Sequence, residues 1–172
     1  ILYFQTGLGH AMRGGNLRKS LSASQNAYLF SLSLGNLALQ ISALANALLA
    51  LSFLGEFYEA ENLCKDIEKL LNKCPYQEIR LIYSINLSAF LIIKGELKRA
   101  ELLIQSAKKD AEKYGLIYCF PVILIYELIL RPLLGEYKEA EKIASQLIDL
   151  VSALNNIFLK GSALMQLGMS YY

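Results

Sequence analysis

Apolar and polar positions along the chain follow the period of an α-helix, in segments that end at regularly spaced glycines. Residues 42–54 are apolar nearly all round, whereas residues 56–73 carry one apolar stripe, acidic residues at the start and lysines at the end. Gly55, between the two segments, is expected to break the helix because glycine accepts a left-handed turn freely. The pattern therefore predicts two antiparallel helices, the first largely buried and the second amphipathic.

The same helix pair recurs with a fixed period. Gly55, Gly95 and Gly135 lie 40 residues apart, and each opens the phrase Gly-Glu-x-x-x-Ala-Glu. A small residue at the same place in three phrases favours close packing of two helices. A degenerate copy of the phrase begins one period earlier, at Gly15. The residues that define the repeat are Gly15, Gly55, Ala60, Gly95, Ala100, Gly135 and Ala140. A constant period of this size indicates a repeat architecture.

The fold predicted from this repeat is all-α. We expect a right-handed α-solenoid of antiparallel helical hairpins, with about four and a half repeats and about nine helices. The whole chain, 1–172, forms one superhelical domain in this interpretation, and both ends fall within a repeat, as in a piece of a longer protein. The expected units are 1–40, 41–80, 81–120, 121–160 and the incomplete 161–172.

Two features of the apolar segments need separate interpretation. The stretch between Lys19 and Glu56 contains no charged residue and is long enough to span a membrane. Ser, Asn and Gln residues interrupt this stretch, and each would be costly in lipid, so we expect two buried helices that turn at Gly35 and no membrane contact. Pro132 lies near the end of the predicted helix 121–134 and should kink or shorten it.

Composition narrows the classes of function. The chain has 17 Lys and Arg against 15 Asp and Glu, spread without a basic stripe, so direct contact with nucleic acid is not expected. Cys64, Cys74 and Cys119 have no metal-ligand spacing and are interpreted as buried residues of a cytoplasmic protein. A disulfide between Cys64 and Cys74 is the alternative.

The residues for catalysis are sparse. His10 is the one histidine of the chain, and no glycine-rich phosphate loop with a following Lys occurs. The carboxylates of the second helices fit solvated faces with Lys or Arg nearby. We therefore predict no enzyme and no catalytic, cofactor-binding or metal site.

The repeat resembles the tetratricopeptide repeat (TPR), a helical hairpin with Gly at the turn and a small residue five positions later. Leu164-x-x-Leu167-Gly168-x-x-Tyr171 matches the first-helix pattern of that family, whereas Ser84 and Glu127 depart from it. The usual period of the family is about 34 residues. The longer unit here is similar to the superhelical sensor domain of MalT-like transcriptional regulators, the family of the maltose-regulon activator. That resemblance implies a module that joins a nucleotide-binding switch to a DNA-binding end and takes part in recognising an effector.

The concave face of such an array is where a partner is expected to bind, because stacked hairpins curve and the first helices line the inner wall. One position on that wall, nine residues before each turn, is mostly polar. Its residues are Thr6, Asn46, Asn86, Tyr126 and Gln166. Side-chain amides can hydrogen-bond a peptide backbone or a sugar. They can equally bond neighbouring helices or remain solvated, and the sequence leaves these alternatives open.

The neighbouring wall positions are apolar, which favours a protein or peptide as the partner. Another domain of the parent chain or a small effector would also fit, and an exposed apolar groove would allow self-association. The sequence thus favours a non-catalytic interaction or sensor module of a larger regulator. The alternative is a stand-alone TPR adaptor or scaffold for complex assembly. Leu2-Tyr3-Phe4-Gln5 resembles the end of a protease-site tag, although it also fits the repeat register and is favoured as native sequence.

Overall fold

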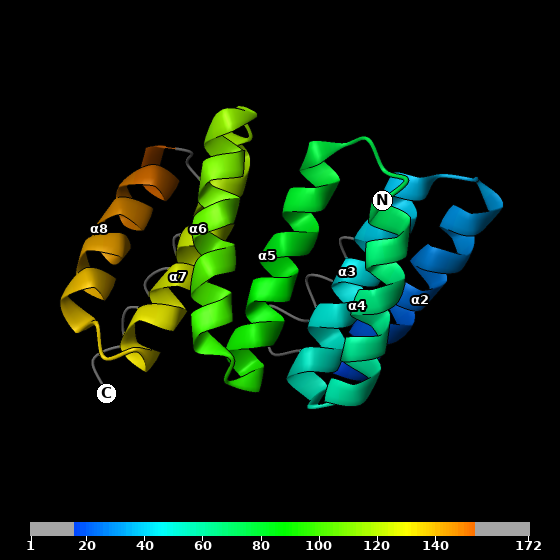
Figure 1. The fold of residues 1–172 in the computed structure, drawn as a ribbon, viewed down its shortest axis with the longest axis horizontal. Helices are drawn as coiled ribbons and strands as arrows, with labels where there is room; N and C mark the ends of the chain where they lie inside the picture. The colour runs from blue at the N-terminus through cyan, green and yellow to red at the C-terminus, as the bar shows by residue number, and fades with distance from the viewer. Residues whose placement is uncertain (1–15, 154–172) are drawn as a thin grey trace. The chain divides into compact units, whose positions relative to one another are not determined.

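The structure, a computed structural model, describes residues 16–153 and is helical over this range (Figure 1). The described part contains seven α-helices, one 3-10 turn at Ile117–Cys119 and no strand, which confirms the all-α prediction. The α-helices are α2 (Leu17–Ser33), α3 (Leu37–Leu54), α4 (Phe57–Leu71), α5 (Gln77–Lys94), α6 (Leu97–Lys113), α7 (Phe120–Leu133) and α8 (Tyr137–Ala153). Gly15 and the first and last of the nine predicted helices lie outside the described residues.

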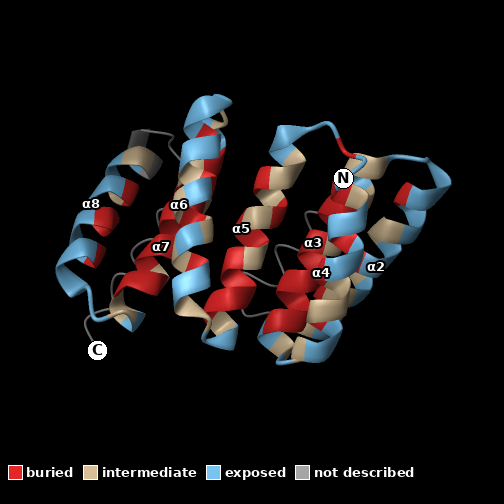
Figure 2. Ribbon diagram, viewed as in Figure 1, coloured by how far each residue is buried: buried red, intermediate tan, exposed pale blue. Residues whose placement is uncertain are grey.

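The helices form two compact units, the first ending at Gly95 and the second beginning at Glu96. In the first unit α3 is central and contacts α2, α4 and α5. In the second unit α7 is central and packs against α6 and α8. Figure 2 shows the consequence: α3 and α7 are mostly buried, whereas α2 and α8 are largely exposed. The prediction of one domain over 1–172 stays a prediction.

Most of the described helices, α2, α3, α5, α6 and α7, end within two residues of a glycine in the left-handed region, whereas α4 ends at Leu71 with no glycine. Gly55 has φ of 75°, and the N–H groups of Gly55 and Glu56 donate to the carbonyls of Ser52 and Leu51 at 3.1 and 3.0 Å. These bonds satisfy carbonyls that the last helical turn leaves unpaired. Between residues 16 and 153, five glycines have positive φ: Gly35, Gly55, Gly95, Gly115 and Gly135.

The turn expected at Gly35 is present, since α2 ends at Ser33 and α3 begins at Leu37. The side chain of Asn36 accepts from the N–H of Leu39 at 3.1 Å and caps α3 there. Pro132 lies in the last turn of α7, which ends one residue later and is the shortest of the described α-helices at 14 residues. In repeat register α7 ends one residue earlier than α3 and α5 and begins three residues later, so Pro132 accounts for at most one residue of the difference in length.

The expectation of two buried helices in the charge-free stretch holds for α3 but is wrong for α2. The residues that α2 buries are three serines, Ser20, Ser24 and Ser31. Leu29 and Phe30 are 62 % and 61 % exposed. Because the small residues occupy the packed stripe of the helix, the large apolar residues fall outside that stripe.

One described helix, α3, is long and apolar enough to cross a membrane by length and composition. However, 67 % of that segment is buried inside the protein. The central helix of a water-soluble bundle has the same character, so α3 alone does not indicate a membrane protein.

The alanines of the repeat phrase are fully packed. Ala60 and Ala100 are 0 % exposed and Ala140 is 1 % exposed. In the second unit Ala140 belongs to a cluster with Leu128, Ile143 and Leu147 that joins α7 to α8. A small residue at this position therefore lies in the packed core of its unit in all three phrases.

Replacing Gly55 with Ala should destabilise the chain through the backbone alone. The turn leaves open space around a Cβ at this position, but φ of +75° is unfavourable for an L-residue. We expect a loss of about 1–2 kcal/mol in the free energy of unfolding, measured by urea denaturation. Gly55→Asn is the matched control and should lose less, because Asn tolerates the left-handed region. Equal losses for the two variants would contradict this account of the turn.

Candidate functional site

The structure describes three of the five wall residues predicted to bind a partner. Asn46 on α3 and Asn86 on α5 are buried, at 5 % and 7 % exposure. The Asn86 amide donates to the carbonyl of Ala45 at 3.0 Å, so it joins α5 to α3. The Asn46 Nδ2 is buried and has no hydrogen-bond partner among the described residues. Thr6 and Gln166 lie outside the described residues.

The sequence left open whether the amides bind a partner, bond neighbouring helices or remain solvated, and Asn86 bonds a neighbouring helix. The apolar positions beside the two amides are also closed to solvent: Ala45, Leu49, Ile85 and Ala89 are each at most 6 % exposed. This stretch of the predicted wall is therefore occupied by the packing of the first unit. Ligand binding by the five wall residues stays a prediction, and Tyr126 is the half-buried one of the three that the structure describes.

Tyr126 lies on α7 and is half-buried. Val122 and Ile129, four residues before it and three after it, are half-buried too. These three side chains share one face of the helix. Burial of the hydroxyl raises the pKa of Tyr126 to about 12, although the residue as a whole is half-buried. The arrangement offers an apolar stripe with one polar group, suited to a peptide or helix.

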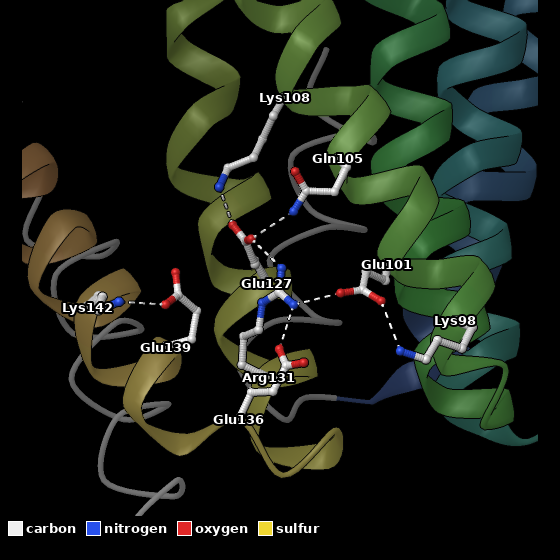
Figure 3. A network of polar contacts seen from close by, with 9 residues as sticks. All are labelled: Lys98, Glu101, Gln105, Lys108, Glu127, Arg131, Glu136, Glu139 and Lys142. Atoms are coloured by element: carbon white, nitrogen blue, oxygen red, sulfur yellow. Dashed lines mark hydrogen bonds and ion pairs between the residues drawn. The ribbon is translucent and has the colours of Figure 1, made fainter.

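A second candidate site is a buried ionic network in the second unit (Figure 3). Its centre is formed by Glu127 and Arg131, one helical turn apart on α7, with 3 % and 8 % exposure. Their side chains meet at 3.0 Å between Arg131 and Glu127 Oε1. Charges buried this deeply must be paired to be tolerated.

Partners for this pair come from α6. Glu101, Gln105 and Lys108 recur at helical spacing and so lie on one face. Gln105 donates to Glu127 at 3.2 Å, and Lys108 forms an ion pair with the same carboxylate. The α6 side chains thus satisfy the carboxylate of Glu127 from two sides.

Arg131 in turn bridges three helical segments. Its Nη1 group donates at 2.7 Å both to Glu101 on α6 and to Glu136, the residue before α8. Burial by itself lowers the pKa of Arg131, but the hydrogen bonds to Glu127, Glu136 and Glu101 outweigh it and raise that pKa. The hydrogen bond from Arg131 holds the pKa of Glu101 below its usual value. Both shifts favour the charged forms of Arg131 and Glu101, which are the forms that pair in the network.

The network was missed at the sequence level, although its signal was present. Glu127 was noted as a departure from the TPR pattern, and Arg131 lies four residues later in an otherwise apolar helix. An acid and a base at this spacing inside an apolar segment indicate a buried pair. The expectation that carboxylates of the second helices lie on solvated faces is wrong for Glu101, whose side chain is 23 % exposed and bonded to Arg131.

An ion pair that Glu101 makes has a counterpart in the first unit. Glu101 and Glu61 occupy the same place in their repeat phrases. Glu61 on α4 pairs with Lys94 near the end of α5 at 2.7 Å, and Glu101 on α6 pairs with Arg131 near the end of α7 at 2.7 Å. In both units the second helix of one repeat is joined to the first helix of the next by the same acidic position.

The cysteines give no sign of reactivity. Cys64, Cys74 and Cys119 are buried and free, so the alternative of a Cys64–Cys74 disulfide is not realised. Burial raises the pKa of the Cys64 thiol, which disfavours the nucleophilic thiolate. Next to it, burial also raises the pKa of Tyr83, whose hydroxyl lies 3.4 Å from Glu68 Oε1.

These contacts define what the described residues can do chemically. The buried carboxylate of Glu127 is bonded to Gln105, Lys108 and Arg131. No group of three or more His, Cys, Asp or Glu within residues 16–153 is placed to hold a metal ion. The geometry supports joints between helices and a half-buried stripe on α7.

Comparison with known proteins adds no identification. No protein-family profile matches the chain, and neither the curated proteins nor the solved structures contain a significant match.

Removal of Arg131 should be strongly destabilising. Arg131→Met leaves Glu127 buried and breaks the bridge from α6 to α8, and we expect a loss of about 3 kcal/mol in urea denaturation. The double variant Glu127→Leu/Arg131→Met should recover much of that loss, since no buried charge remains. Arg99→Met is the matched control, because the Arg99 side chain is 69 % exposed in its pair with Glu96 and such pairs contribute less than about 1 kcal/mol. Equal losses for Arg131→Met and Arg99→Met would contradict the network.

Stability should fall at acidic pH, partly through Glu101. Its pKa is lowered in the folded protein, so its contribution is fully present above its unfolded pKa, about 4.3. The contribution is lost as pH falls below that value and through the lower folded pKa. Urea denaturation between pH 7 and pH 3 should show a shallower decline for Glu101→Gln than for the wild type. A decline of the same slope in both proteins would refute this assignment.

Proposed function

We propose that the chain is a non-catalytic interaction module of the TPR type, built as a right-handed α-solenoid of 40-residue hairpins. The observation that carries this proposal is the repeated joint between a second helix and the following first helix. Glu61–Lys94 and Glu101–Arg131 place the same acidic position of the repeat at 2.7 Å from a base on the next helix. A solenoid grows by repeating one such joint between neighbours.

The chemistry of the described residues supports binding rather than catalysis. The buried polar groups Asn86, Glu127 and Arg131 are used in contacts between helices. The accessible stripe around Tyr126 is apolar with one hydroxyl, which suits an amphipathic helix or an extended peptide. A partner protein, or another domain of the parent chain, is the ligand that we propose for this stripe.

We further propose that the module belongs to a larger regulatory protein. This proposal is supported only by the 40-residue unit and by its resemblance to MalT-like regulators.

The proposed binding stripe can be tested by quantitative pull-down from a lysate of the source organism with the full chain as bait. Tyr126→Ala should reduce capture of a specific partner by about tenfold, the effect of losing an aromatic anchor. Tyr137→Ala is the matched control, because Tyr137 is 59 % exposed on α8 and lies away from the stripe. Capture of the same proteins in equal amounts by both variants and by the wild type would contradict the assignment of the stripe.

A further inference from the structure

The turn between α4 and α5 differs from the two turns that occupy the same place in the repeat. Those two turns have glycines of positive φ, Gly35 after α2 and Gly115 after α6, and Pro75 lies one 40-residue period from each. Proline fixes φ at about −65° and has no N–H group, so the turn after α4 cannot take the same form. Helix α4 also ends at Leu71, two residues before the counterpart of the last residues of α2 and α6.

The two glycine turns close the preceding helix with a backbone hydrogen bond. After α2 the N–H of Asn36 donates to the carbonyl of Ser31 at 3.1 Å. After α6 the N–H of Leu116 donates to the carbonyl of Ala111 at 2.8 Å. Each bond satisfies a carbonyl that the last turn of the helix leaves unpaired. The corresponding carbonyl of α4 is that of Leu71, one period from both acceptors.

At the end of α4 a side chain supplies hydrogen bonds to the carbonyls. Arg80, in the first turn of α5, donates from Nη2 to the carbonyl of Leu71 at 2.5 Å and to the carbonyl of Cys74 at 3.1 Å. The N–H of Cys74 also donates to the Leu71 carbonyl, at 3.0 Å, in a tight last turn. A cation is unfavourable at the start of its own helix, whereas the carbonyl end of α4 attracts it.

We propose that Arg80 is a side-chain latch that closes the end of α4 in place of the backbone bond of the glycine turns. The latch holds the start of α5 against the end of α4. It thereby positions α5, the helix whose Asn86 amide bonds α3. The turn at Pro75 can open through the loss of one side chain, whereas the backbone holds the turns at Gly35 and Gly115.

Thermal unfolding and hydrogen exchange of the full chain test the latch. Arg80→Met should lower Tm by about 5 °C, because hydrogen bonds from a charged group are lost. The amides of Lys73 and Cys74, which donate to carbonyls in the last turn of α4, should exchange about tenfold faster in this variant. The amide of Leu116, which closes the glycine turn after α6, should keep its wild-type rate.

Restoring the glycine turn gives the sharpest arm of the experiment. In a Pro75→Gly background, Arg80→Met should lower Tm by less than about 2 °C, because a backbone bond can then close α4. Arg99→Met is the matched control, since this arginine is 69 % exposed in its pair with Glu96. It should change Tm little, and equally, in both backgrounds.

Equal losses of Tm for Arg80→Met in the two backgrounds would overturn the proposal, because Arg80 would then not stand in for the missing turn. An Arg80→Met variant with the Tm and the amide exchange of the wild type would overturn it as well. So would a loss of Tm in Arg99→Met as large as in Arg80→Met, because the effect would then be one of charge rather than of the latch.

Discussion

The left-handed glycine turn is the constraint on which the described structure depends. A helix that is to pack against the next one must stop and reverse, and its last carbonyls need partners when it stops. Gly55 meets both requirements, since its positive φ redirects the chain and the N–H of Glu56 closes the helix end. Gly95 and Gly135 also have positive φ at the fixed period, and α4, α6 and α8 each begin two residues after such a glycine.

Buried polar residues join helices in this chain in two ways, as a neutral amide and as a charged pair. The hydropathy of the sequence alone does not distinguish the two. In the first unit a neutral amide, Asn86 on α5, donates to a carbonyl of α3. In the second unit the same task falls to a charged pair, Glu127 and Arg131, with α6 supplying the remaining partners. Buried charges specify which helices meet more strictly than an apolar contact does, since a wrong partner leaves a charge unpaired.

The sequence predicts the helices and their ends well because glycine turns and helical periodicity are local signals. For Asn86 the sequence predicts either partner binding or a bond to a neighbouring helix. It does not identify the acceptor, the carbonyl of Ala45, because that residue lies 41 positions away in the sequence. Glu127 and Arg131 were likewise visible, whereas their joint use depends on α6 facing α7. The exposure of Leu29 was not foreseen, because an uncharged stretch looks the same whether its leucines face a core or solvent.

The backbone conformation of the turn glycines, measured by NMR in the full chain, tests the central claim most directly. Scalar couplings and carbon chemical shifts report φ and helix ends residue by residue. The account predicts helical shifts that stop at Gly55, Gly95 and Gly135, with positive φ at all three glycines. Helical shifts that continue through any of these positions, or strand shifts on either side of them, would contradict it.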